Sequence, residues 1–395
     1  MREEKYTVSS AVGNIGVGYF RTTDRARGYI KKVLDSGRVT YGPFHRRFES
    51  KFASLHDSKF SVFVNSGTSA LHIALQSLKE RHGWRDGDEV IVPALTFVAT
   101  INIVLHNRMK PVLCDIKRDD FGINPDLLES LITKRTKAII PVHIMGMPCD
   151  MDGVLSAARR HNLKIIEDSC ETVFAKHNGR PVGSMGDIGC FSSYAAHTIV
   201  TGVGGLAVTS DPDLAVRLRS LANHGRDGIY LNIDDDDGKT GAEMREIISR
   251  RFRFLSVGHS FRATEFEAAL GLAEIEEAKK NIDARRLNAF YLRDHLSGVV
   301  GFQALLPGRE SVPMTFPIIA KNKPRMVEHL EANGIETRDL LPLTRQPVYK
   351  GMWDPKDYPV ADYMNRHAFY VGCHPGLSVR DLDRIVKAVK SCNQF

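Results

Sequence analysis

The chain has 395 residues, 43% of them hydrophobic, and a formal net charge of +7. This length allows two or three domains, and the hydrophobic fraction is enough for a large buried core. Basic pairs such as those at 46–47 and 285–286 have no interleaved aromatic residues, which argues against a nucleic-acid-binding protein. The charge is equally compatible with anionic small-molecule substrates.

No apolar run approaches the ~20 residues of a membrane helix, and the start, MREEKYTVSS, lacks the apolar stretch of a signal peptide. The six cysteines lie far apart, without a CxxC pair or a metal-ligand spacing. We therefore expect a cytoplasmic protein with reduced cysteines, no metal site and no membrane association.

Short apolar segments typical of strands alternate with helical patterns through the first half of the chain. We expect strands at 60–64, 89–95, 110–116, 137–144 and 163–168, and helices at 69–78, 124–135 and 151–162. Alternation at this spacing predicts an α/β fold with a mostly parallel, doubly wound sheet that is covered by helices on both faces.

The alternation ends at 228–256, where a DDDD run predicts a solvated excursion. A helical pattern over 262–296 then leads to a smaller C-terminal α+β part. We divide the chain into an N-terminal segment (1–27), a large domain (28–280) and a small C-terminal domain (281–395).

Two segments predict a binding site at the ends of strands. In NSGTSAL, a strand is followed by Gly67 and Thr68 at the start of a helix, where unpaired N–H groups suit a phosphate. Helix capping without a ligand explains this motif equally well. Asp168, in IIEDSCE, falls at the carboxyl end of a strand, where open α/β sheets bind ligands. A helix cap is again an equal explanation.

Six segments resemble, in their order along the chain, the DegT/DnrJ/EryC1/StrS family of pyridoxal-phosphate-dependent sugar aminotransferases. They are SGRVTYGPFHRRFESKFA, NSGTSAL, VPALTFVAT, EDSCE, GRPVGSMGDIGCFSSY and GHSFRATEFEAALG. The resemblance runs from about residue 28 to the end. It implies the fold type I aminotransferase architecture, a homodimer with active sites at the subunit interface, and nucleotide-linked keto-sugar substrates.

The resemblance also implies roles for individual residues. Gly67 and Thr68 give backbone N–H groups to the cofactor phosphate, and Ser192 gives its hydroxyl. Phe97 stacks on the pyridine ring. Asp168 pairs with the pyridine nitrogen and keeps it protonated, so that the ring acts as an electron sink.

Other positions depart from the family pattern or carry weaker assignments. Glu171 stands near the ring hydroxyl, where the family usually has Gln. Ser260 stands where an Asn commonly reaches the partner subunit's cofactor phosphate, so this contact is left open. Arg338 is the candidate for binding the carboxylate of the amino donor, for which the resemblance suggests glutamate.

The main departure is His197, in SSYAAHTIVTGVGG, at the position of the family's lysine. That lysine holds the cofactor covalently and moves protons between cofactor and substrate. Imidazole cannot form the same stable imine, so we expect pyridoxal phosphate or pyridoxamine phosphate to be held non-covalently. With an ordinary pKa of about 6.5, His197 can still move protons near neutral pH.

A branch of the family, the 3-dehydratases of NDP-4-keto-6-deoxy sugars, also has His at this place. The chain resembles this branch in AHTIVTGVGG (196–205), Glu171, GRD (225–227), ATE (263–265), TRQP (344–347) and FYVGCHPGLS (369–378). The resemblance thus implies a dehydratase (a lyase) in which His197 removes a proton from the amine-bearing carbon of pyridoxamine phosphate and helps to expel the hydroxyl at carbon 3 of the sugar.

Two alternatives stay open, namely an NDP-sugar aminotransferase with an atypical His and a catalytically silent family member. One subgroup of the dehydratases needs an iron–sulfur cluster and a reductase partner, and its cysteines begin just after GRD. Here Gly228 follows GRD, and no cysteine occurs between Cys190 and Cys373. We therefore expect neither the cluster nor the reductase.

Overall fold

The protein is represented by a computed structural model that describes residues 13–231 and 234–393. A seven-stranded sheet forms its centre, in the order β1-β9-β8-β5-β4-β2-β3. Its strands are β1 (Phe60–Val64), β2 (Glu89–Pro93), β3 (Lys110–Cys114), β4 (Thr136–Ile139), β5 (Lys164–Asp168), β8 (Ile188–Ser192) and β9 (Gly205–Thr209). Neighbours are parallel from β8 to β3, whereas β9 is antiparallel to both β1 and β8. The expected mostly parallel sheet is confirmed.

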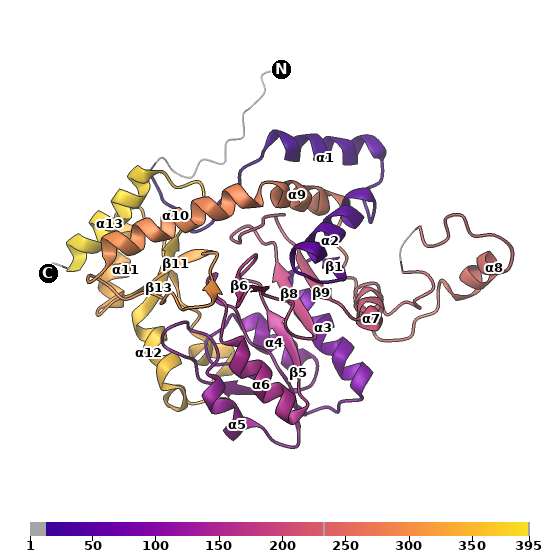
Figure 1. Cartoon of the computed structure of the whole chain (residues 1–395), viewed down its shortest axis with the longest axis horizontal. Helices are drawn as coiled ribbons and strands as arrows, with labels where there is room; N and C mark the ends of the chain where they lie inside the picture. The colour runs from indigo at the N-terminus through magenta and orange to yellow at the C-terminus, as the bar shows by residue number, and fades with distance from the viewer. Residues whose placement is uncertain (1–12, 232–233, 394–395) are drawn as a thin grey trace.

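Thirteen α-helices and two small sheets complete the described part of the chain (Figure 1). The helices are α1 (Asp24–Ser36), α2 (Pro43–Leu55), α3 (Gly67–His82), α4 (Val98–His106), α5 (Leu128–Leu131), α6 (Met151–His161), α7 (Pro212–Ala222), α8 (Gly241–Arg250), α9 (Glu265–Glu276), α10 (Ala278–Leu296), α11 (Lys323–Ala332), α12 (Pro359–His367) and α13 (Val379–Asn393). The small sheets contain β6 (Lys176–His177), β7 (Arg180–Pro181) and β10 (Arg309–Glu310), and β11 (Thr315–Ile319), β12 (Arg338–Asp339) and β13 (Ala368–Gly372).

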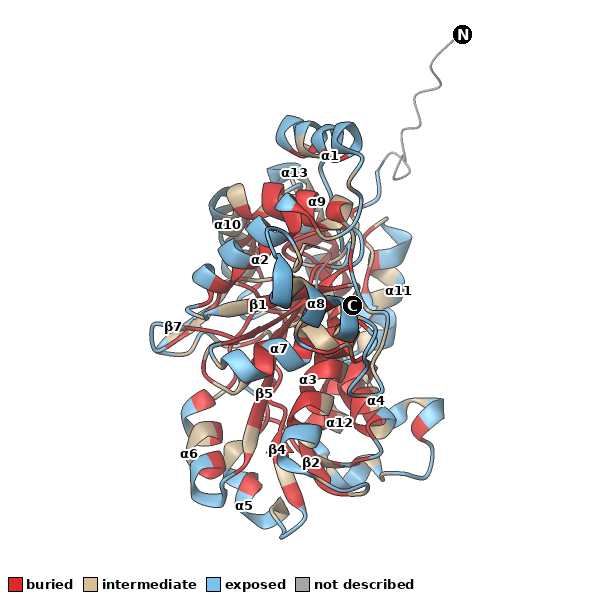
Figure 2. Ribbon diagram, turned by 90° about the vertical axis from the view of Figure 1, so that its right-hand side faces the viewer, coloured by how far each residue is buried: buried red, intermediate tan, exposed pale blue. Residues whose placement is uncertain are grey.

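Successive side chains of each strand point to opposite faces of the central sheet, and helices bury both faces. Ile91, Ile139 and Ile165 belong to a hydrophobic cluster with residues of α2, α6 and α9. Val90 and Ile166 belong to a second cluster with residues of α3, α4 and α7. In Figure 2 the strands at the centre are accordingly buried, while α1 shows mostly exposed residues. This is the two-sided covering that the strand–helix alternation predicts.

Local sequence and hydrogen bonds account for several of the element bounds. The strand expected at 60–64 has those bounds, and Asp150 caps α6 by accepting from the N–H of Gly153. The helix expected at 124–135 is reduced to a 3-10 turn and the short α5. The helix ends where Ile132 becomes extended (ψ 126°), and the N–H of Thr133 donates to the Thr136 hydroxyl (2.9 Å), a local bond that competes with helical structure.

Two expectations for the later part of the chain need correction. The helical pattern at 262–296 forms two helices, α9 and α10, which meet at Glu277. The excursion at 228–256 stands away from the body as expected, and it contains a helix, α8, that the sequence did not indicate (Figure 1). Positions 232–233 of this excursion lie outside the described residues, as do positions 1–12 of the N-terminal segment.

A third hydrophobic cluster gathers residues of α10, α11, α13, β11 and β13. Ile15 joins this cluster and forms a parallel bridge with Ile335, so part of the N-terminal segment packs with the C-terminal part of the chain. The division at residue 280 stays a prediction. No helix among residues 13–231 and 234–393 has the length and apolarity needed to cross a membrane.

The start of α2 is capped from a distant part of the sequence. Its N-cap residue, Gly42, has no side chain to satisfy the free N–H groups of the first turn. The Glu265 carboxylate, only 1% exposed, instead accepts from the N–H groups of Gly42 (2.7 Å), Phe44 (3.0 Å) and His45 (2.8 Å). This one side chain joins α9 to α2.

We predict that Glu265→Ala lowers the free energy of unfolding by about 3 kcal/mol, because three buried N–H groups lose a charged acceptor. Urea-induced unfolding measures the change. As a control, Glu243→Ala removes an exposed carboxylate from the first turn of α8 and should cost less than about 1 kcal/mol. Equal losses in the two variants would contradict the capping role.

Candidate active site

The start of α3 forms a cradle of backbone N–H groups. Ser66 caps this helix through its side chain, but the N–H groups of Gly67 and Thr68 have no acceptor inside the helix. A Cβ atom on Gly67 would lie 2.8 Å from both Cys170 Sγ and Ser192 Cβ, so only glycine allows this close approach. The structure thus brings together the three residues predicted to bind a phosphate.

Asp168 ends β5 and is only 4% exposed. Its carboxylate accepts from the Thr100 hydroxyl (2.8 Å) and from the Cys170 N–H (3.1 Å). No ion pair to Asp168 is formed within the described part of the chain. Burial raises the pKa of Asp168, and the hydrogen bonds from Cys170 and Thr100 offset only part of this shift. Such a carboxylate is suited to bind a cationic group, for example a protonated ring nitrogen.

Glu171 follows the end of β5, and Phe97 lies between β2 and α4. The half-buried Glu171 accepts from the N–H of Met145 (3.2 Å). Burial and, less strongly, the Asp168 carboxylate raise the pKa of Glu171 to about 7, so near neutral pH it can donate a hydrogen bond much as Gln does. Phe97 precedes α4 with its ring 57% exposed, which leaves the ring free to stack on a ligand.

His197 lies in the loop between β8 and β9, whose main chain is held by internal hydrogen bonds. The N–H of Ser193 donates to Gly204 (3.0 Å), and the N–H of Thr201 donates to Ser193 (2.9 Å). A Cβ atom on Gly204 would lie 2.4 Å from Ser193 Oγ, which explains a glycine there. His197 itself donates its N–H to Tyr194 (2.9 Å). The loop therefore presents His197 from a hydrogen-bonded turn.

The imidazole of His197 is half-buried and uncharged at neutral pH. Its Nδ1 lies 3.4 Å from the carbonyl oxygen of Ser192. Burial and, more weakly, the Arg285 cation lower the pKa of His197 to about 4, although the Ser192 carbonyl raises it. Our expectation of an ordinary pKa is therefore wrong, because the sequence does not show how deeply the ring is packed.

Two predicted residues lie apart from this group. Ser260 lines a separate hollow of about 430 Å³, where Arg262 donates to its hydroxyl (3.1 Å). Arg338, on β12, is exposed and paired with Glu336. Arg338 lies opposite Tyr370 in the pairing of β12 with β13. Burial and, less strongly, the Glu171 carboxylate raise the pKa of Tyr370 to about 12, while Arg338 lowers it.

Sequence reasoning missed two residues that support the site. Thr100 reaches Asp168 from α4, and Arg285 donates to the carbonyl of His197 (3.2 Å) from α10. A threonine within the apolar segment VATINIVL is a weak signal for Thr100. Nothing in the local sequence distinguishes Arg285 from the neighbouring Arg286.

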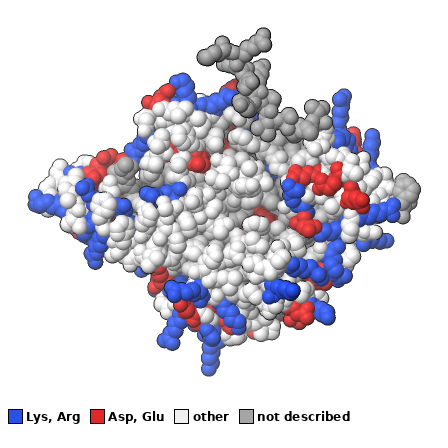
Figure 3. All heavy atoms as spheres, turned by 180° about the vertical axis from the view of Figure 1, so that it is seen from behind, with Lys and Arg blue, Asp and Glu red and all other residues white. Residues whose placement is uncertain are grey.

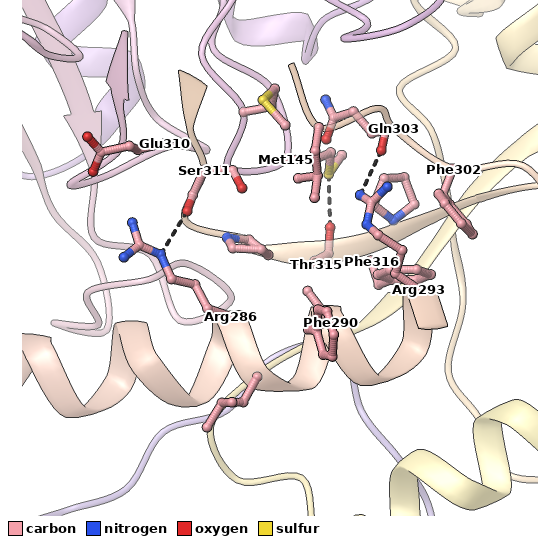
Figure 4. A pocket seen from close by; sticks show the side chains of 16 residues that line it. Met145, Arg286, Phe290, Arg293, Phe302, Gln303, Glu310, Ser311, Thr315 and Phe316 are labelled. Atoms are coloured by element: carbon pink, nitrogen blue, oxygen red, sulfur yellow. Dashed lines mark hydrogen bonds between the residues drawn. The ribbon is translucent and has the colours of Figure 1, made fainter. Parts of the chain in front are cut away.

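An apolar groove of about 450 Å³ lies between α10 and the segment that precedes β11 (Figure 4). It borders the site through Met145, whose Sδ is contacted by the Thr315 hydroxyl (2.9 Å). None of the predicted site residues lines this groove. The groove is therefore a neighbour of the candidate site and not the site itself.

The model of the DegT/DnrJ/EryC1/StrS aminotransferase family matches residues 21–390. The chain belongs to this family. It is 34% identical to GDP-perosamine synthase of Caulobacter vibrioides, over 96% of this chain and 98% of that protein. Among solved structures it is similar to Escherichia coli GDP-4-keto-6-deoxy-D-mannose-3-dehydratase with bound hydrated PLP (26% identity, 95% and 99% coverage, TM-score 0.85). DesV of S. venezuelae is also similar (30% identity, 94% coverage of both chains, TM-score 0.83).

Pyridoxal phosphate is the cofactor of this family, and the residues of the site fit it. The N–H cradle at Gly67 suits the phosphate, and the exposed ring of Phe97 suits an aromatic partner. The buried Asp168, which lacks an ion-pair partner among the described residues, suits a protonated pyridine nitrogen. The fold type I architecture is likewise confirmed by these similarities.

We predict that Asp168→Asn weakens the binding of pyridoxal phosphate by at least about tenfold, since it removes a charge-assisted hydrogen bond. The fold should survive, because the amide oxygen can still accept from the Cys170 N–H. Absorbance titration of the purified protein measures the dissociation constant. Asp213→Asn, at an exposed position in the first turn of α7, is the control. An unchanged affinity in Asp168→Asn would contradict the pairing.

Proposed function

We propose that the protein is a 3-dehydratase of a nucleotide-linked 4-keto-6-deoxy sugar, with pyridoxamine phosphate held non-covalently and His197 as acid and base. The observation that carries this proposal is the place of His197, in a loop that contains no lysine and with Nδ1 of its ring 3.4 Å from the carbonyl oxygen of Ser192. Glutamate is the proposed amino donor that regenerates the cofactor. The more general assignment, a pyridoxal-phosphate-dependent sugar enzyme, follows from the family.

When bound, the amine form of the cofactor supplies an electron sink that allows loss of a proton from its own carbon and departure of the hydroxyl at carbon 3 of the sugar. His197 is equipped to accept that proton. The carbonyl oxygen of Ser192 can only accept a hydrogen bond, so Nδ1 of His197 carries the ring proton. Nε2 then has a free lone pair for the base step.

The same imidazole is suited to the acid step that follows. Burial lowers the pKa of His197 to about 4, so once protonated it gives up its proton readily. The departing hydroxyl of the sugar is the group that needs a proton at this stage. One short side chain can thus serve both steps without the reach of a lysine.

In this proposal the other residues stabilise the charges of the cofactor and orient it. Asp168 keeps the ring nitrogen protonated, which increases the capacity of the ring to accept electrons. Glu171, with its pKa raised to about 7, donates a hydrogen bond near the ring hydroxyl. Gly67, Thr68 and Ser192 bind the phosphate. Arg338 can bind a donor carboxylate only after it leaves Glu336.

A second candidate function is amino transfer to an NDP-keto sugar. The 34% identity to a GDP-perosamine synthase favours it. Against it stands His197, because imidazole cannot supply the covalent attachment and the mobile amine that the family's lysine provides. The resemblance of GRD (225–227) and TRQP (344–347) to the dehydratase branch adds to the case for dehydration.

A homodimer is part of the proposal. Phe97, Tyr194 and Val203, on loops around the candidate site, are each more than half exposed in the single chain. Apolar side chains exposed together are typical of surfaces that bind another protein. Seen from behind, the protein also has a central area with few Lys, Arg, Asp or Glu side chains, which gather around its edge (Figure 3). Such surfaces suit a second subunit.

The non-covalent mode of cofactor binding leads to a first prediction. Borohydride reduction of the protein saturated with pyridoxal phosphate should leave the mass of the polypeptide unchanged, because no lysine replaces His197 in its loop. Intact mass spectrometry is the measurement. A cofactor adduct mapped by peptide analysis to Lys176, or to any other lysine, would show that the cofactor is attached elsewhere.

The role of His197 leads to a second prediction. With a panel of NDP-4-keto-6-deoxy sugars, pyridoxamine phosphate and glutamate, the protein should release ammonia and a 3-deoxy sugar. His197→Asn should slow this release by at least ~10²-fold, since it removes the acid and base. His197→Lys should attach the cofactor covalently and depress dehydration. Parental rates in His197→Asn would exclude the proposed mechanism, and an amino sugar as the product of the parent would favour the aminotransferase.

A further inference from the structure

Arg285 is a buried cation that holds the main chain of the His197 loop. Its side chain is among the most buried of the charged groups, with the residue 3% exposed. From α10 its guanidinium donates to the carbonyl oxygens of His197 (3.2 Å) and Met314 (2.7 Å). Met314 directly precedes β11, so one side chain joins the loop to the C-terminal part of the chain.

This cation has an unusual set of partners. Within 13–231 and 234–393, Arg285 forms no ion pair, although the Glu274 carboxylate is near enough to offset part of the lowering of the pKa of Arg285 by burial, and the Nε atom of Arg285 has no hydrogen-bond partner. Burying a guanidinium without an opposite charge is costly, so the site must be held by its carbonyl contacts. Burial accordingly lowers the pKa of Arg285. An apolar residue would fill the same place at lower cost if packing were its only role.

The loop is also held at a second point, from the preceding helix. Glu274, on α9, accepts a hydrogen bond from the backbone of Val200. Thr198 and Val200 line a small cavity of about 100 Å³ together with Glu274 and Arg285. The four residues from His197 to Val200 therefore rest against side chains of both α9 and α10.

We propose that Arg285 is a positioning residue for His197, which fixes the backbone of this histidine against α10 and the start of β11. The consequence for turnover rests on the proposed function, but the contact itself does not. Two groups act on the His197 ring besides Arg285: the Ser192 carbonyl at Nδ1, and the Tyr194 ring, edge-on at 6.1 Å between centroids. Of these three, Arg285 alone carries a charge. Its charge favours the uncharged imidazole.

The neighbouring arginine offers a matched control. Arg286 lies on the same helix but is exposed, and its Nε donates to the carbonyl of Ser311 (3.0 Å), at the apolar groove (Figure 4). Arg286→Gln removes the same charge from the adjacent position without a contact to His197. Arg285→Gln removes the charge and the fork of donors, while Arg285→Lys keeps the charge and loses the fork.

The test is the titration of His197 by NMR in protein with labelled histidine, with the His197 signal assigned by its loss in His197→Asn. Arg285→Gln should raise the pKa of His197 by at least about 0.5 unit, since a nearby like charge disfavours the imidazolium. Arg286→Gln should leave it unchanged. Arg285→Lys should stay closer to the parent in this titration. These readouts need no substrate, so they hold even if dehydration is never observed.

The second measurement is kcat and KM, for a substrate that the parent protein turns over. Arg285→Lys should lower kcat by about tenfold with KM within about twofold, because a displaced base slows the chemical step more than binding. An unchanged His197 titration in Arg285→Gln would overturn the proposal. If Arg285→Gln does not fold, the test rests on Arg285→Lys. A parental kcat together with a parental His197 titration in that variant would overturn the proposal.

Discussion

The candidate site depends on the close approach of α3 to the ends of β5, β8 and β9. Gly67 leaves no space for a Cβ atom against Cys170 and Ser192, and a Cβ atom on Gly205 would lie 2.2 Å from the carbonyl oxygen of Ser66. Two glycines therefore allow a helix start, with its free N–H groups and positive dipole end, to lie beside a buried carboxylate. Any larger side chain would separate the anion-binding part of the site from Asp168.

The charges of the site are complementary to a ligand that is negative at one end and positive at its ring. Asp168 is buried and forms no ion pair among the described residues, Glu171 has a pKa of about 7, and the His197 imidazole is uncharged at neutral pH. The buried carboxylates of Asp168 and Glu171 cost free energy in the absence of a partner and become favourable when one binds, whereas an uncharged imidazole costs little at neutral pH. The fold stabilises this arrangement through hydrogen bonds from backbone groups and hydroxyls rather than through ion pairs.

The sequence predicts the parts of this site that depend on local chemistry. Asp168 and Gly67 lie at the end of a strand and at the start of a helix, positions that short-range patterns reveal. The contacts of Thr100 with Asp168 and of Arg285 with His197 span 68 and 88 residues, so no local pattern indicates them. The same limit explains the wrong pKa expected for His197, which depends on burial.

Replacement of the family's lysine by His197 affects the attachment of the cofactor and also the way in which a proton is moved. A lysine in a dry site needs a long, mobile chain to reach both the cofactor and the substrate. His197 instead has its main chain fixed on both sides, by Tyr194 within the loop and by Arg285 from α10. A ring held in this way can move a proton only over a short distance. The proposed reaction requires this ring to face the hydroxyl that leaves from carbon 3, rather than the neighbouring carbon 4 that receives the proton in amino transfer. The rigidity of the loop is therefore as important to the proposed reaction as the identity of its base.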